Sequence, residues 1–410
     1  MPVRLDQVFA PAPRPARPRI WLWLGLLPLF VLLGFAMALL FSTQPLPQQS
    51  MGFWGIALGA PLGGWCVLSL GRVLLYSGQH LAADGWDEAR EEDIARRIRQ
   101  GRRSQQVLGA CFYSALRASG EQPTTQLDAL LDGTIALKAQ PSSLDDAPLR
   151  HSRLPGYAKE DPEIALLQVV VHVLADLAQT LAQLPDEQPL ALLLEVDSDL
   201  PETQLRRVWR QAWSESGIRQ SVVAIEECGL AAVDQWLDQR IDDQALLLIV
   251  AVRFSPAQPE GTAEAAVGLL LGNRLTQAVL PPIAYLHRPE QEREPGTERL
   301  RSAVRQALDW VPLDTESIAH VWRAGIDSHR DAAITTVLAE LSMPVTHDQG
   351  LLNLDVALGD PGKASPWLAI ACAVQTIQRG AGPQFIISGA GSIETGIWST
   401  VLTPVPPLSK

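Results

Sequence analysis

The chain has 410 residues, of which 47% are hydrophobic and 19% are charged, and its formal net charge is −12 at pH 7. This acidic balance excludes a general nucleic-acid-binding protein, because phosphate neutralisation needs clustered lysine and arginine. The four cysteines, Cys66, Cys111, Cys228 and Cys372, are far apart and form no CxxC pair, and the seven histidines are scattered. We therefore expect no disulfide framework, no metal site and no cofactor.

Two apolar stretches near the N-terminus predict a transmembrane helical hairpin over residues 20–77. Residues 20–41 contain no charged side chain, and at about 1.5 Å per residue they can cross a hydrocarbon core roughly 30 Å thick. A second run, residues 51–71, is also free of charge and continues past Arg72. The segment between the two runs is polar and contains proline, so we expect a tight connection between the spans.

Three glycines in the second span, Gly55, Gly59 and Gly63, recur every four residues and therefore lie on one face of a helix. Small residues at this spacing allow helix backbones to approach closely in lipid. We predict that this face packs against the first span, or else against a helix of a partner.

Arginines flank the two spans, whereas the loop between them carries no charge. By the positive-inside rule, the N-terminal tail (residues 1–19) and the whole body after the spans face the cytoplasm, which places the protein in a bacterial inner membrane with two spans. Residues 78–104 are expected to form a juxtamembrane helix. Its arginines either contact anionic lipid or are simply solvated.

Residues 105–400 alternate short apolar runs with amphipathic segments, which is typical of an α/β fold. The expected strands of the first half are residues 105–116, 189–198, 221–225, 245–254 and 264–272, and its helices are residues 163–184, 201–217 and 229–240. The runs "ALLLEV" and "ALLLIVAV" are apolar without interruption, so their sheet must be covered on both faces in a layered α/β body.

The same cycle restarts at Gly296, which predicts a second, similar half. Its expected helices are residues 297–311, 330–341 and 366–380, and its expected strands are residues 318–325 and 383–391. The glycine-rich run at residues 387–396 opens no βαβ unit, so we expect a loop that closes the sheet. Residues 401–410 are expected to be a proline-rich tail.

Four segments within residues 105–390 carry a resemblance to a known family. They are "ECGLAAVDQWL", "EGTAEAAVGLLLG", "HVWRAGIDSHRDAAITTVL" and "LNLDVALGDPGKASPWLAIACAVQTIQRG". In content and order they resemble the nucleophile segment and the later motifs of β-ketoacyl synthases, which belong to the thiolase-like superfamily. The resemblance implies a thiolase-like body with αβαβα layers built from two pseudo-repeats, and it implies a homodimer.

The catalytic positions that the resemblance assigns are altered in this chain. Ketosynthases acylate a cysteine at a helix N-terminus, and Cys228 matches that position, but the acidic Glu226 and Glu227 beside it would disfavour a thiolate. The first family histidine falls at Arg323 or Ala324.

The second motif departs in the same way. Asp355 stands at the lysine position, Asp360 stands at the second histidine position, and His329 lies a few residues after the first one. We expect a degenerate site in which Cys228, His329 and Asp360 are vestigial, and hence a chain that is not an enzyme.

We predict a membrane-anchored, non-catalytic binding protein. In plan it is similar to accessory proteins of type VI secretion, acting as adaptor, chaperone or immunity partner for a secreted effector or a secretion-machinery component. Trp209 and Trp213, four apart on one helix, either pack in the core or belong to an interface. Two alternatives remain open, namely a membrane-bound β-ketoacyl synthase-like acyltransferase that uses Cys228, and a structural subunit of an envelope complex.

Overall fold

The computed structural model describes residues 9–41, 50–117, 123–140, 148–157, 160–389 and 396–406. The described residues form two compact units, one that ends at Arg97 and one that begins at Ile98. The expected tight connection between the spans lies outside the described residues, as do parts of both expected tails.

The N-terminal unit is helical. It contains α1 (Ile20–Leu40), α2 (Met51–Trp54), the π-helical turn η2 (Gly55–Gly59) and the start of α3 (Ala60–Gly101). The helix α1 has no buried residue, and both α1 and the continuous helix Met51–Gly101 are long and apolar enough to cross a membrane. Because α3 runs without a break through residues 77 and 78, the expected juxtamembrane helix continues the second span.

The glycine face predicted on the second span does not pack against α1. No heavy atom lies within 4 Å of the Cβ position at Gly55, Gly59 or Gly63. The prediction that this face packs on the first span is therefore wrong, and its alternative, a helix of a partner, stays a prediction.

A glycine of α1 makes the close approach instead. A Cβ at Gly34 would lie 1.9 Å from Cγ of Pro61 and 3.1 Å from the carbonyl oxygen of Ala57. Nearby, the indole Nε1 of Trp65 donates to the carbonyl oxygen of Trp23 at 2.8 Å. The spacing rule pointed to the helix with more glycines, whereas packing requires glycine where the two backbones come closest.

The body consists of eleven strands in one sheet path, a small hairpin and eight helices among the described residues. The strands of the main sheet are β1 (Ser104–Tyr113), β4 (Leu190–Asp197), β5 (Val222–Ala224), β6 (Leu246–Arg253), β7 (Ala265–Asn273), β8 (Ala284–His287), β9 (Glu290–Gln291), β10 (His320–Ala324), β11 (Leu351–Asn353), β12 (Gln384–Ser388) and β13 (Trp398–Pro404). The hairpin pairs β2 (Lys138–Gln140) with β3 (Leu149–His151). The helices are α4 (Pro123–Leu131), α5 (Pro162–Leu181), α6 (Glu202–Glu215), α7 (Gly229–Gln239), α8 (Thr297–Asp309), α9 (Asp331–Glu340), α10 (Leu354–Ala357) and α11 (Ser365–Gln378).

The sheet is built from two repeats with one topology. The first half has the strand order β1-β7-β6-β4-β5, and the second half has the order β8-β13-β12-β10-β11. In each half the first two pairings are antiparallel and the last two are parallel. The strands β1 and β8 pair with each other and join the halves. This match confirms the two predicted pseudo-repeats.

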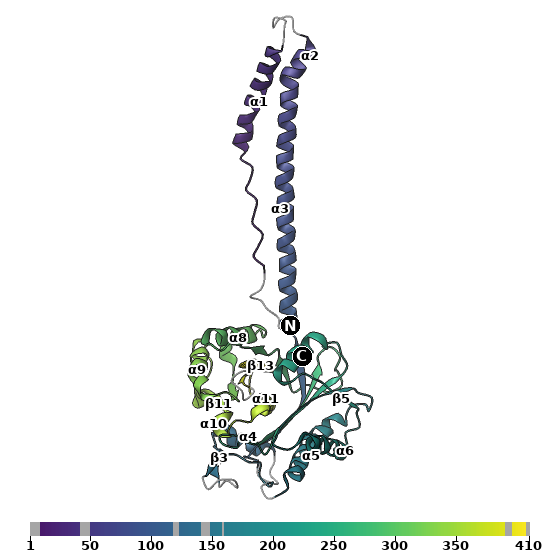
Figure 1. Cartoon of the computed structure of the whole chain (residues 1–410), viewed down its shortest axis with the longest axis vertical. Helices are drawn as coiled ribbons and strands as arrows, with labels where there is room; N and C mark the ends of the chain where they lie inside the picture. The colour runs from purple at the N-terminus through teal and green to yellow at the C-terminus, as the bar shows by residue number, and fades with distance from the viewer. Residues whose placement is uncertain are drawn as a thin grey trace. The chain divides into compact units, whose positions relative to one another are not determined.

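Helices cover both faces of the two halves. Twelve of the fourteen residues of α11 are buried, and α11 contacts strands of both repeats, so it is a central helix together with α7. A second apolar cluster joins α5 and α6 to the other face of the first half. Figure 1 shows α5 and α6 on one side of the body, α8 and α9 on the other, and α11 between them. The layers follow the predicted αβαβα order.

Four strands of the second half of the sheet, β8, β9, β11 and β13, were not predicted from the sequence. Residues 401–404 belong to β13, and Val401 and Leu402 are fully buried, so the assignment of these residues to a tail is wrong. The strand β12 therefore does not close the sheet, because β13 lies between it and β8. The polar residues of "WSTVLTP" hid the strand, because Ser399 and Thr400 are fully buried although they interrupt the apolar pattern, and Oγ1 of Thr400 donates to the carbonyl oxygen of His287 at 2.8 Å.

Trp209 and Trp213 lie on α6 with ring centroids 5.6 Å apart. Both side chains are partly buried against the apolar cluster beneath α5 and α6. Packing thus accounts for much of their surface, and an interface role for the exposed remainder stays a prediction.

A buried network of charged side chains connects the two repeats beside α7. Arg288 is fully buried and forms ion pairs with Asp234 and Asp238 of α7. Close to it, Glu290 accepts a hydrogen bond from the indole Nε1 of Trp310 at 2.6 Å. Burial raises the pKa of Glu290 from its ordinary value of 4.5 to about 7.

This shifted pKa gives a prediction for stability against pH. Because the folded state holds the Glu290 proton more tightly than the unfolded chain does, this carboxyl lowers stability as pH rises from about 4.5 to 7, and its full cost is present above pH 7. We expect Glu290→Gln to raise the unfolding free energy by about 2–3 kcal/mol at pH 8 and to leave it unchanged at pH 4. Denaturant titrations at both pH values measure this, with the exposed Glu294→Gln as control; an equal gain at both pH values would refute it.

Candidate functional site

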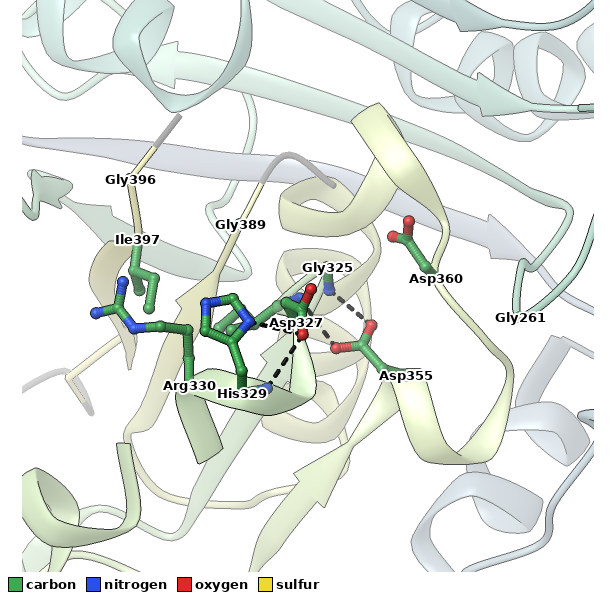
Figure 2. Close-up of a pocket in the computed structure, with 11 residues that line it drawn as sticks. Gly261, Gly325, Asp327, His329, Arg330, Asp355, Asp360, Gly389, Gly396 and Ile397 are labelled. Carbon is green, nitrogen blue, oxygen red and sulfur yellow. Dashed lines mark hydrogen bonds and ion pairs between the residues drawn. The ribbon is translucent and has the colours of Figure 1, made fainter. Parts of the chain in front are cut away.

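A cavity of about 260 Å³ opens at the ends of strands of the second repeat (Figure 2). It lies next to the loop that follows β10, to α10 and to the glycine-rich run after β12. Its lining residues are Gly261, Gly325, Ile326, Asp327, His329, Arg330, Asp355, Asp360, Gly389, Gly396 and Ile397. Residues 390–395 of the glycine-rich run lie outside the described residues. Among the described residues, no group of three or more His, Cys, Asp or Glu side chains could hold a metal ion.

His329 and Asp327 form a histidine–carboxylate pair at the cavity. The ring Nδ1 of His329 lies 2.8 Å from Oδ1 of Asp327, and the backbone N–H of His329 donates to the same oxygen at 3.0 Å. These bonds lower the pKa of Asp327, with the side-chain bond to His329 the largest cause. Because Nδ1 faces a carboxylate, the other ring nitrogen, Nε2, is left to exchange a proton with a ligand.

Asp355 is a partly buried carboxyl of the cavity. Its Oδ1 accepts the backbone N–H of Gly325 at 2.6 Å, and its Oδ2 accepts that of Ile326 at 3.1 Å. Burial raises the pKa of Asp355 to about 7, and this effect outweighs the two backbone hydrogen bonds, which lower it. A carboxyl group that titrates near neutral pH in a cavity can act as a proton donor or acceptor.

Asp360 is held at the edge of the cavity by backbone and side-chain contacts. Its N–H donates to the carbonyl oxygen of Gly261 at 2.9 Å, and its carbonyl oxygen accepts from Ala263 at 2.8 Å. Its Oδ2 lies 3.1 Å from Nη1 of Arg253, whose Nε lies 3.5 Å from Oδ2 of Asp197. Asp360 is thus neutralised by Arg253 and stands where an anion-binding histidine was expected.

The two positions aligned with the first family histidine do not reach the cavity. Arg323 is buried, forms an ion pair with Asp331 and donates to the carbonyl oxygen of Ile326 at 3.1 Å. Ala324 is fully buried. His329 takes the place in the cavity because the loop after β10 turns back at Gly325 and continues into a short 3-10 turn.

Cys228 is the N-cap residue of α7, and its side chain is exposed and makes no capping hydrogen bond. It is not among the residues that line the cavity. The first N–H of the helix, that of Gly229, donates to Oε1 of Glu195 at 2.5 Å, and Oε2 of Glu195 accepts from the indole Nε1 of Trp367 at 2.7 Å. A carboxylate therefore already occupies the positive end of the α7 dipole.

The other body cysteines are of a different kind. Cys111 and Cys372 are buried, and burial raises the pKa of both thiols above the ordinary range. They are core residues, as their apolar sequence settings indicated.

A short series of contacts connects Cys228 with the cavity. Glu195, which caps the helix after Cys228, lies on β4 two residues before Asp197. Asp197 is beside Arg253 of β6, and Arg253 is paired with Asp360 of the cavity. Arg253 of the first repeat thus pairs with Asp360 of the second repeat, and Glu195 and Asp197 lie on the same face of the neighbouring strand β4.

The structure brings together only part of the predicted site. His329 and Asp360 share the cavity, whereas Cys228 lies outside its lining. Asp327, the partner of His329, was not predicted from the sequence. Neither were Gly389 and Gly396 of the glycine-rich run, which also line the cavity. Asp327 could have been found, because it directly follows a strand and its turn in "RAGID".

The comparisons with known proteins are informative only at the level of structure. No protein-family model and no curated protein matches the sequence. The ishigamide ketosynthase/chain length factor matches with a TM-score of 0.53 and 16% identity, over 74% of this chain and 99% of that one. The PfaC keto synthase–chain length factor matches at 0.52 and 11%, over 75% and 43%. An oxazolomycin ketosynthase domain (OzmH KS7) of Streptomyces albus JA3453 matches at 0.50 and 12%, over 75% and 76%.

These matches establish that the body has a thiolase-like α/β fold of the ketosynthase kind. The prediction that the chain is not an enzyme is contradicted, because the body shares an enzyme-like fold with a solved ketosynthase domain and with ketosynthase/chain length factors. The prediction had treated changed motif residues as a loss of the whole site, although a neighbouring histidine and three carboxyls line the cavity. Type VI secretion, a protein partner, the cytoplasmic orientation and a homodimer stay predictions.

Proposed function

We propose that the chain is a membrane-anchored acyltransferase of ketosynthase-like fold, in which Cys228 accepts an acyl group and the cavity receives the molecule to which it is passed. The observation that carries the proposal is the exposed thiol at the N-terminus of a central helix. In this fold that place presents a thiol to ligands, and the side chain of Cys228 is not engaged in capping the helix.

The chemistry of the proposal has two balanced steps. The thiol of Cys228 attacks an acyl thioester, its proton leaves with the departing thiol, and a new thioester forms on Sγ. A hydroxyl or amine in the cavity then attacks this thioester, and His329 takes the proton of the attacking group. The bond between the acyl carbon and Sγ breaks, an ester or amide leaves, and the departing thiolate of Cys228 takes the proton back from His329, which restores the thiol. Asp327 orients the imidazole and stabilises its charged form.

The capped helix end sets the expected rate. Because Glu195 binds the first N–H of α7, that N–H does not stabilise a thiolate or an oxyanion at Cys228. We therefore expect slower acylation than in an enzyme whose helix end is open.

A substitution tests this electrostatic effect directly. Glu195→Gln removes the negative charge and keeps one oxygen, which can accept from Gly229 or from the indole Nε1 of Trp367, so the charge that opposes a thiolate at this helix end is gone. We expect alkylation of Cys228 by iodoacetamide at pH 7 to become about three- to tenfold faster. The measurement uses a Cys66→Ala background and Glu226→Gln as the control with an exposed charge. An unchanged or slower rate for Glu195→Gln would show that the Glu195 cap does not control the reactivity of the Cys228 thiol.

Membrane attachment is part of the proposal. The apolar side chains of α1 are exposed along its length, and α1 and the helix from Met51 are long enough to span. The body helix α5 is also apolar enough by composition, but it is packed against the sheet. We infer that α1 and the first part of α3 anchor the enzyme with its body on the cytoplasmic side, where acyl thioesters are supplied.

The acylation step is the experiment for this function. Full-length protein in detergent, with Cys66→Ala as background, is incubated with a series of acyl-CoA thioesters and analysed by intact mass. We expect a hydroxylamine-sensitive acyl adduct that maps to Cys228 and is absent from Cys228→Ser. Absence of any adduct, or an adduct that persists in Cys228→Ser, would overturn the proposal.

A further inference from the structure

The carboxylate of Asp355 spans the gap between two segments of the second repeat. Asp355 lies in the one-turn helix α10, which follows β11, whereas the atoms that it binds belong to the loop after β10. Its two oxygens each accept one of two successive backbone N–H groups, those of Gly325 and Ile326 (Figure 2). Because both oxygens are engaged, the carboxylate fixes the direction of the loop as well as its position.

The loop that Asp355 binds carries the histidine–carboxylate pair of the cavity. Gly325 has a left-handed backbone with φ of 66°, and His329 follows four residues later in a 3-10 turn. At the start of the loop, Arg323 donates to the carbonyl oxygen of Ile326 at 3.1 Å, and the N–H of Gly389 donates to the carbonyl oxygen of Ala324 at 3.0 Å. The two N–H groups at residues 325 and 326 have Asp355 as their acceptor.

We propose that Asp355 is a positioning residue, whose ionised carboxylate holds the backbone at residues 325–326 and thereby keeps His329 and Asp327 facing the cavity. The proposal deepens the proposed function, since it rests on that function for the role of His329. The claim about the loop itself stands on the geometry of Asp355 alone.

Titration of Asp355 supports a pH-sensitive form of this contact. The groups that face it are Asp360, which raises its pKa, and Arg323, which lowers it, and the cavity adds Asp327, His329 and Arg330. With burial as the largest cause, the pKa is about 7. Protonation turns one oxygen into a donor, so one of the two N–H groups loses its acceptor.

Local opening and overall stability therefore respond to pH with opposite signs. The folded state binds the Asp355 proton more tightly than the unfolded chain does, so this group alone makes the fold more stable as pH falls from about 7 to 4. Opening of the loop alone breaks the two N–H bonds that lower the pKa of Asp355 and leaves its carboxyl on α10 partly buried, so the open loop binds the proton more tightly and opens more often over the same range. If Asp355 contributed only to overall stability, the loop would open less often at the lower pH, where the fold is more stable.

Hydrogen–deuterium exchange of full-length protein in detergent tests the proposal. Exchange of peptides covering residues 324–330 is measured at pH 6 and pH 8, corrected for the intrinsic rate, in the unaltered chain, in Asp355→Asn and in the exposed control Asp348→Asn. In the unaltered chain and the control we expect about tenfold more opening at pH 6 than at pH 8. In Asp355→Asn we expect high opening at both pH values, while β1 and β7 keep their protection.

Three outcomes would overturn the proposal. They are equal opening at both pH values in the unaltered chain, protection in Asp355→Asn that matches the unaltered chain, and a loss of protection that spreads to β1 and β7. If Asp355→Asn does not fold, the comparison of the two pH values in the unaltered chain still decides. Because no acyl donor is used, failure of Cys228 acylation with the expected exchange would refute the proposed function and leave the positioning role intact.

Discussion

Replacing His329 by alanine is expected to lower the rate of acyl transfer from acylated Cys228 at least about 100-fold at pH 8, because His329 takes the proton of the attacking hydroxyl or amine and both oxygens of Asp355 are engaged by backbone N–H groups. The side chain is 55% exposed, so its loss should leave the melting temperature unchanged within about 1 °C. The rate is measured in single turnover, starting from the acyl-enzyme, with acceptor in excess. Acylation of Cys228 itself should be little affected.

The matched control is His347→Ala, which removes an exposed histidine from the 3-10 turn before β11. It should transfer the acyl group at the unaltered rate. If His329→Ala also transfers at the unaltered rate, the histidine–carboxylate pair is not the base, and the cavity has been given the wrong role.

Gly325→Ala is expected to have the largest effect on stability, lowering the unfolding free energy by about 3 kcal/mol or more. Two costs add at this position. The backbone has a left-handed φ of 66°, and a Cβ would lie 2.4 Å from Oγ of Ser365 and 3.0 Å from the carbonyl oxygen of Gly389. The loop cannot move away without breaking the two hydrogen bonds to Asp355.

Gly217→Ala separates the two costs. Gly217 has φ of 74° and nothing within 4 Å of its Cβ position, so alanine there should cost only about 1 kcal/mol. Denaturant unfolding of both variants measures the difference. Equal losses would mean that the packing of the loop against Ser365 and Gly389 contributes little.

Periodicity was sufficient to predict the long elements of the body. The helix α5 and the strands β4 and β6 match their predicted ranges closely, because a long amphipathic helix and a buried apolar strand each leave an unmistakable pattern. The restart at Gly296 predicted the second repeat, which the strand order confirms. What could not be predicted are short strands such as β8 and β13, whose position depends on pairing with strands far away in sequence.

The site was harder to predict from the sequence for the same reason, because contacts between residues far apart in the chain decide which loops meet. Its loops come from residues 325–330, 355–360, 389 and 396, and only the fold places them around one cavity. The motif match assigned the first family histidine to Arg323 or Ala324, whereas a turn at Gly325 brings His329 to the cavity. The carboxylate that caps α7 comes from Glu195, thirty-four residues before Gly229, and nothing local to Cys228 indicates it.

The two N-terminal helices show the limit of a spacing rule. Glycines at every fourth residue correctly mark a face of small residues, but they do not say which surface covers it. The contact between the two helices depends on Gly34, a single glycine that no repeat marked.

A structure of the full-length protein with a bound non-hydrolysable acyl-CoA analogue tests the central claim most directly. Our account predicts that the carbonyl carbon of the analogue lies about 3–3.5 Å from Sγ of Cys228, and that the cavity beside His329 and Asp327 remains open to an acceptor. Density that places the analogue's carbonyl away from Cys228, with the thiol untouched, would contradict it.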